Sequence, residues 1–243
     1  MVTVTIQGES RQVEQGTTYE AIAAEYQKEY GGTIALVCVN GKIRELFKKV
    51  TRDCTIEFFT LRDSVGHKSY IRAAKMLFFK SVNDVFGAMA ARKSCVEFSI
   101  GRGLYINTLG TVEATAENAR RIKERMAQLV EAKTPFMKKS YPLDDAIELF
   151  RKKGMEDKVK LFRFRMGSTV NVYEMEGYCD YYYGYMLPNA GYIRWYDVIP
   201  YEEGFMLVLP SESNPTALEP FADRRKLFDT IESAKNWGRT AGI

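Results

Sequence analysis

The sequence has few of the side chains that most often carry out chemistry. It contains a single histidine, His67, and four cysteines, Cys38, Cys54, Cys95 and Cys179, with no CxxC pair among them. Zinc sites and thiol catalysis draw on several such groups at suitable spacing, so we expect no metal and no cofactor in this chain. The cysteines stand among apolar or β-branched neighbours, which predicts buried free thiols and a reducing, cytoplasmic environment.

Long apolar runs and targeting signals are also lacking. No segment approaches the roughly 18 consecutive apolar residues of a membrane span, and the N-terminus opens on the alternating Val2, Val4 and Ile6 rather than on a signal peptide. We therefore expect no membrane partner. Hydrophobic residues make up 46% and charged residues 27% of the 243 residues, ordinary values for a globular chain, and the length favours two domains.

The excess of positive charge is small. Lys and Arg number 35 against 31 Asp and Glu, a formal charge of +4, which does not by itself indicate nucleic-acid binding. The densest basic stretch could contact phosphates or form a solvated face, and the solvated face is the favoured interpretation. This stretch comprises Arg151, Lys152, Lys153, Lys158, Lys160, Arg163 and Arg165.

Residues 1–62 have the pattern of a small β-grasp domain. Asn40-Gly41 between two strand-like segments predicts a hairpin turn, and Gly31-Gly32 ends a helix that starts at Thr17 or Thr18. The expected strands cover 2–6, a short stretch around Val13, 34–39 and 54–61.

Residues 63–243 predict an α+β domain with one antiparallel sheet. Apolar residues at helical spacing indicate helices over 69–86, 115–132, 143–153 and 224–237, the third entered through Ser140-Tyr141-Pro142 and stopped by Gly154. Strands are expected over 95–99, 104–107, 169–175, 178–183, 192–199 and 205–209, with an exposed loop over 211–220. The chain is expected to continue beyond Ile243.

A phosphate-cradling loop of the form GxxxxGK[ST] is missing. The only Gly-Lys pair is Gly41-Lys42, which is followed by Ile43 and lies in the predicted hairpin turn. Since that motif supplies the backbone amides, the lysine and the magnesium-binding hydroxyl of a P-loop, we expect no ATP site within these residues.

Two family resemblances follow from these patterns. Residues 2–61, with Val39-Asn40-Gly41 and the closing strand at 55–59, resemble a TGS domain, a ubiquitin-like fold that occurs in threonyl-tRNA synthetases and other proteins. From His67 through Asn107, the long helix, two strands and Gly101-Arg102-Gly103 resemble the second domain of threonyl-tRNA synthetase, whose editing site uses an HxxxH pair and a Cys-x-x-x-His pair.

The second resemblance places the editing-site positions at Met76, Lys80, Tyr182 and Met186. None of these is an imidazole or a thiolate, so the resemblance implies that zinc binding and editing hydrolysis are lost and that a relict ligand pocket is left. Nucleotide or small-molecule binding there is the expectation.

Several neighbours of this pocket have alternative interpretations. Gly101-Arg102-Gly103 could approach a phosphate, but a β-turn is favoured. Tyr183 and the tyrosines around it could stack a base, with Asp180 accepting a hydrogen bond, although packing is the commoner role of strand aromatics. His67 with Asp63 and Ser64 indicates helix capping rather than a hydrolytic triad.

A third resemblance covers nearly the whole chain. Gly66-His67-Lys68, the segment 146–161, and Tyr181 to Pro188 are similar to the N-terminal region of bacterial uridine kinase-like proteins. This resemblance implies a non-catalytic accessory region whose partner is its own C-terminal kinase domain, with ATP and magnesium bound beyond residue 243. The alternatives are an RNA-binding or tRNA-like-binding module and a residual aminoacyl-tRNA deacylase.

Overall fold

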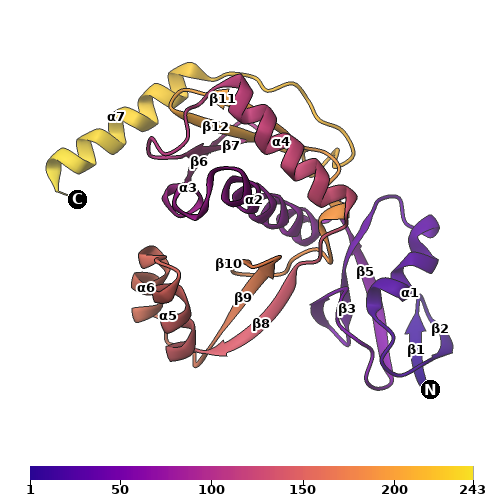
Figure 1. Ribbon diagram of the computed structural model, residues 1–243. Coiled ribbons are helices and arrows are strands. Elements are labelled where there is room, and N and C mark those ends of the chain that lie inside the picture. Colours follow the sequence, from indigo (N-terminus) through magenta and orange to yellow (C-terminus); the bar gives the residue numbers. More distant parts are fainter. Residues whose placement is uncertain (243) are drawn as a thin grey trace.

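The computed structural model describes residues 1–242 and has an α+β architecture with three separate sheets. The long helix α2 (Ser64–Phe86) runs through the middle of the molecule. Figure 1 shows the N-terminal sheet at one end of α2 and the two other sheets on either side of this helix. This placement makes α2 the element to which most of the remaining structure is attached.

The N-terminal sheet has five strands in the order β2-β1-β5-β3-β4, with β1 and β5 parallel and the other pairs antiparallel. Helix α1 (Tyr19–Tyr26) begins where the Thr18 hydroxyl accepts a hydrogen bond from the Ala21 amide, and a 3-10 turn (Gln27–Glu29) follows it. The four expected strands and the helix of this region are confirmed, although α1 ends before the predicted Gly31-Gly32 and β4 was not among the expected strands. The strands are β1 (Val2–Ile6), β2 (Glu9–Val13), β3 (Ile34–Val39), β4 (Lys42–Glu45) and β5 (Cys54–Thr60).

Helix α2 begins at Ser64, earlier than the residue 69 that apolar periodicity predicts. Asp63 occupies the N-cap position, and its carboxylate accepts hydrogen bonds from the Thr60 amide at 2.6 Å and the Thr60 hydroxyl at 2.9 Å. The first helical turn contains Gly66 and His67, which carry no apolar signal. Asp63, Ser64 and His67 therefore lie at the start of a helix, but the Asp63 side chain bonds back to Thr60 and makes no capping hydrogen bond to the helix.

A four-stranded antiparallel sheet, β11-β12-β7-β6, covers one side of α2 together with the helices α3 and α4. The strand expected over 192–199 is present, but its predicted start is wrong: Asn189 caps a 3-10 turn (Ala190–Tyr192), and the strand begins only at Asp197. The short helix α3 was not predicted. The elements are α3 (Ala88–Lys93), β6 (Cys95–Ile100), β7 (Gly103–Asn107), α4 (Ala116–Glu131), β11 (Asp197–Tyr201), β12 (Gly204–Val208) and α7 (Arg225–Ala241).

The third sheet has the order β10-β9-β8 and is also antiparallel, so the expectation of one sheet after residue 62 is wrong. The 140–142 segment, expected as a helix entry, is the end of β8 (Met137–Pro142), and it pairs with β9 (Thr169–Met175). Strand β10 (Tyr178–Tyr181) stops two residues before the predicted end. Helices α5 (Leu143–Lys152) and α6 (Glu156–Arg163) lie beside β8 and β9 in Figure 1.

The largest hydrophobic cluster surrounds α2 and also takes in Ala35, Leu36 and Leu61 from the N-terminal region. A second cluster fills the space between α1 and the N-terminal sheet, and a third lies between α5, α6 and the β9–β10 pair. Within residues 1–242, no helix combines the length and the apolarity that crossing a membrane requires.

Candidate functional site

A cavity of about 430 Å³ lies against the polar side of α2. Its walls come from α2, from the segment that joins α3 to β6, from the start of α6, and from β10 with the two residues after it. Four cations and two carboxylates line it, an excess of two positive charges.

The two carboxylates of the cavity are both paired with Lys158. Its ammonium lies 2.8 Å from the Asp157 carboxylate and 3.5 Å from that of Asp180, which is buried. Burial raises the pKa of Asp180 although Lys158 opposes the shift. Burial alone would lower the pKa of Lys158, but the two carboxylates raise it overall. Lys158 therefore stays charged and is fully engaged by its two neighbours.

The two arginines of the cavity are held by backbone contacts rather than by carboxylates. Arg72 donates to the Tyr185 carbonyl at 3.2 Å and lies flat against Gly184, where a Cβ would come within 2.6 Å of the guanidinium carbon. Arg92 donates to the Lys153 carbonyl at 2.9 Å, and a Cβ on Gly154 would come within 2.8 Å of it. Gly154 and Gly184 both have positive φ, a conformation that favours glycine. Because glycine has no Cβ, it also leaves room for the neighbouring arginine.

Lys75 and Tyr182 complete the cationic side of the cavity. The Lys75 ammonium lies 5.9 Å from the centre of the Tyr182 ring, and no carboxylate within residues 1–242 pairs with it. Burial lowers the pKa of Lys75, and the charge of Arg72 lowers it further. The Tyr182 hydroxyl is closed to solvent and lies near the Asp180 carboxylate, although no hydrogen bond of ordinary length and angle joins the two in the described part of the chain. Burial holds the pKa of this hydroxyl well above its ordinary value, and the charge of Asp180 adds to the effect.

The structure separates the residues that the sequence analysis assigned to the pocket. Asp180, Tyr182 and Tyr183 line the cavity. Met76 and Met186 are fully buried in the hydrophobic cluster around α2 and do not line it.

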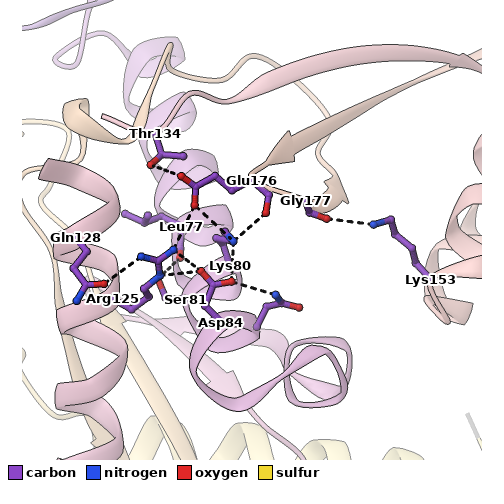
Figure 2. Close-up of polar contacts among 11 residues, drawn as sticks. Leu77, Lys80, Ser81, Asp84, Arg125, Gln128, Thr134, Lys153, Glu176 and Gly177 are labelled. Atoms are coloured by element: carbon purple, nitrogen blue, oxygen red, sulfur yellow. Dashed lines mark hydrogen bonds and ion pairs between the residues drawn. The ribbon is translucent and has the colours of Figure 1, made fainter. Parts of the chain in front are cut away.

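Lys80 also points away from the cavity and belongs to an ion-pair cluster that joins α2 to α4 and to the β9–β10 turn. Its ammonium donates to Asp84 at 2.7 Å and to the Glu176 carbonyl at 3.1 Å, as Figure 2 shows. Arg125 from α4 binds the other oxygen of Asp84 at 2.8 Å. Lys80 is 4% exposed, so this cluster, rather than a ligand, satisfies its charge.

Gly101, Arg102 and Gly103 lie on another part of the molecule. They form the turn between β6 and β7, Gly101 has a φ of 57°, and Arg102 pairs with Glu219. A Cβ on Gly103 would overlap Met206, so its glycine is explained by packing. These residues agree with the favoured β-turn interpretation and do not line the cavity.

Sequence reasoning missed Arg72, Lys75 and Arg92 as a group. Arg72 and Lys75 are three residues apart on α2 and so share one helix face, and this spacing could have been recognised in the sequence. Arg92 comes from the unpredicted helix α3, and only tertiary structure brings it to the cavity.

A larger cavity of about 950 Å³ opens between the N-terminal sheet and the start of β8. We call it the basic groove, because no carboxylate lines it and its cations are Lys42, Arg44, Lys48, Lys49, Arg52 and Lys138. Lys138 pairs with the buried Glu45 at 2.5 Å, whereas the other cations have no ion pair within residues 1–242. Phe47 and Met137 add partly exposed apolar surface.

No group of three or more His, Cys, Asp or Glu side chains suited to hold a metal ion occurs in the described residues. Burial raises the pKa of the Cys179 thiol. Cys95, which lines the cavity, is exposed and Cys38 is half-buried, so the expectation of buried thiols holds only for Cys54 and Cys179.

No family model matches the chain. It is similar to curated threonine–tRNA ligases, among them those of Thermotoga neapolitana (26% identical over 214 residues, 86% of this chain and 31% of that protein) and Syntrophotalea carbinolica (27% over 192 residues, 77% of this chain and 29% of that protein). The ligase of Porphyromonas gingivalis is 23% identical over 193 residues, 77% of this chain and 28% of that protein. The chain thus spans about 30% of the length of these relatives.

These relatives overturn the expectation of an accessory region of a nucleoside kinase. These threonine–tRNA ligases match over 77–86% of the chain. The expectation of a uridine or nucleoside kinase, a transferase, is corrected with it, and none of these relatives supports a kinase domain as the partner. The similarity favours the alternatives, an RNA-binding or tRNA-like-binding module and a residual aminoacyl-tRNA deacylase, over the accessory region of a kinase.

Proposed function

We propose that this chain is an RNA-binding unit related to threonine–tRNA ligases, and that the basic groove holds the sugar-phosphate backbone of a structured, tRNA-like RNA. The observation that carries the proposal is the one-sided charge of this groove. Six cations and no carboxylate line it, although the chain as a whole carries only +4. Such local concentration is the electrostatic pattern of a phosphate-binding surface.

The proposal includes a division of the chain into two units. Residues 1–62 would be a β-grasp domain of the TGS type, which the sheet order β2-β1-β5-β3-β4 and the helix between β2 and β3 support. Residues 63–243 would be a relative of the second domain of threonyl-tRNA synthetase, supported by the similarity to threonine–tRNA ligases. The basic groove lies where these two units meet, since β8 supplies Lys138 and the N-terminal sheet region supplies the other cations.

The experiment compares two triple variants of equal charge. Lys42→Gln with Lys49→Gln and Arg52→Gln removes three unpaired cations from the groove, whereas Lys28→Gln with Lys93→Gln and Lys160→Gln removes three exposed lysines elsewhere. Binding of a fluorescent tRNA is measured by anisotropy over a range of salt concentrations. The groove variant should bind at least about tenfold more weakly. The slope of the logarithm of the binding constant against the logarithm of salt concentration should also be smaller, by up to about one for each phosphate that the variant no longer neutralises.

The control variant should bind tRNA like the wild-type protein. Equal weakening by both variants would mean that only net charge matters and would contradict the assignment to the groove. Absence of salt-dependent binding by the wild-type protein would contradict the proposed function itself.

A further inference from the structure

Arg72, Lys75 and Arg92 line the cavity beside α2, and none of these three cations has an anionic partner in the described residues. A pocket with a purely structural role does not need such unpaired cations. The two carboxylates of the cavity are both taken up by Lys158. No carboxylate within residues 1–242 pairs with Arg72, Lys75 or Arg92. Three positive charges therefore border one cavity, and the single net negative charge of Lys158 with its two carboxylates offsets only one of them.

We propose that this cavity binds a small organic phosphate monoester, with its phosphate among Arg72, Lys75 and Arg92. This site is distinct from the basic groove and does not depend on RNA binding there. The excess of two positive charges matches a phosphate dianion better than a single carboxylate. The volume of about 430 Å³ exceeds what phosphate alone fills, and it lies within the usual range for small-molecule sites.

The organic part of the ligand would lie along the tyrosine wall. Tyr183 lines the cavity and is 81% exposed, so its ring is open to contact by a flat group. Tyr181 packs edge-on against Phe162 at 5.0 Å and is held by Arg165, so that side of the wall is fixed. Arg72 and Arg92 are likewise held before binding by the Tyr185 and Lys153 carbonyls. A preorganised site of this kind loses little conformational entropy when the ligand enters.

The test uses phenyl phosphate as the probe in calorimetric titrations of the full chain, beside inorganic phosphate and benzoate. Phenyl phosphate should bind with submillimolar affinity, and both other compounds should bind more weakly. Benzoate binding as tightly as phenyl phosphate would overturn the choice of phosphate. If inorganic phosphate bound as tightly as phenyl phosphate, the claim that the site holds an organic group would be overturned. No detectable binding of phenyl phosphate would overturn the whole proposal.

Two variants place the binding in this cavity. Lys75→Gln should weaken phenyl phosphate binding about tenfold or more, whereas Lys28→Gln, an exposed lysine on another surface, should leave it unchanged.

A terminal phosphate of RNA carries the same chemistry, and competition separates the two sources. A 5′-phosphorylated trinucleotide should displace phenyl phosphate no better than the same concentration of a nucleoside monophosphate. Stronger displacement by the trinucleotide would overturn the assignment to a free small molecule.

Discussion

His67 is the only histidine of the chain, so its protonation can be followed without interference from another imidazole. It lies in the first turn of α2, and its Nδ1 atom is buried without a hydrogen-bond partner among residues 1–242. Burial lowers the pKa of His67, while the carboxylate of Glu212 opposes the shift. The folded protein therefore favours the neutral ring.

This shift predicts how stability changes with pH. A histidine whose pKa is lower in the folded state binds a proton more readily when unfolded, so protonation below its ordinary pKa of about 6.5 favours unfolding. The free energy of unfolding should therefore fall between about pH 7.5 and about pH 5.5, and it should fall less in His67→Gln. Urea denaturation of both proteins at the two pH values measures the difference. NMR titration of the imidazole C–H signal gives the pKa directly, and a folded-state midpoint at or above the ordinary value would contradict the prediction.

Lys80 and Arg72 show at the residue scale why the candidate site was predicted only in part. The resemblance to the HxxxH pair of threonyl-tRNA synthetase placed Met76 and Lys80, four residues apart on one helix face, in the same pocket. The face that borders the cavity carries Arg72, Lys75 and Phe79, one stripe further round the helix. Periodicity gives the faces of a helix, but it does not say which face meets a cavity and which meets the ion pairs of α4.

At the scale of elements, the helices and strands with a clear apolar period could be predicted. Helix α4 was expected over 115–132 and occupies Ala116–Glu131, because its buried residues recur at helical spacing. Strand β8 was missed because it is exposed along most of its length and carries Lys138 and Lys139 among polar neighbours. Helix α6 was missed because its buried Val159 and Phe162 lie within the basic stretch. Elements that bury little apolar surface leave little trace in the sequence.

The approach of α2 to β5 depends on one residue without a side chain. A Cβ on Gly66 would lie 2.0 Å from the Thr60 carbonyl oxygen, a backbone atom that cannot rotate away. Gly66→Ala should therefore push α2 away from the end of β5 and lower the free energy of unfolding by about 1–3 kcal/mol or more.

Gly31→Ala is the matched control, since a Cβ there would meet no atom within 4 Å and its φ is not positive. Guanidinium denaturation of both variants measures the difference. Equal stability of the two variants would mean that α2 does not need this close approach.

At the scale of the whole molecule, the N-terminal sheet is joined to the rest by polar contacts as well as by the shared hydrophobic cluster around α2. Glu45 at the end of β4 is 2% exposed and accepts hydrogen bonds from Lys138 at 2.5 Å and from the Tyr173 hydroxyl at 2.9 Å. The same hydroxyl lies 2.9 Å from the Gly184 carbonyl. On the α1 side, Glu20 accepts from Asn189 and Tyr192, both at 3.1 Å. These contacts position β8, and with it Lys138, at the edge of the basic groove.

Breaking the Glu45 contact should therefore weaken the whole molecule rather than one hairpin. Glu45→Gln removes the charge that pairs with Lys138 in a site nearly closed to water, so we expect a loss of about 1–3 kcal/mol in the free energy of unfolding. Glu57→Gln changes the net charge equally at an exposed position on β5 and should cost less than about 0.5 kcal/mol. Urea denaturation followed by far-UV circular dichroism measures both variants. Because Lys138 and Tyr173 belong to the third sheet and Glu45 to the first, hydrogen exchange in the Glu45→Gln protein should quicken on both sides of the contact. Faster exchange in β3 and β4 alone, with β8 and β9 unchanged, would mean that Glu45 stabilises only its own hairpin and does not join the two parts of the molecule.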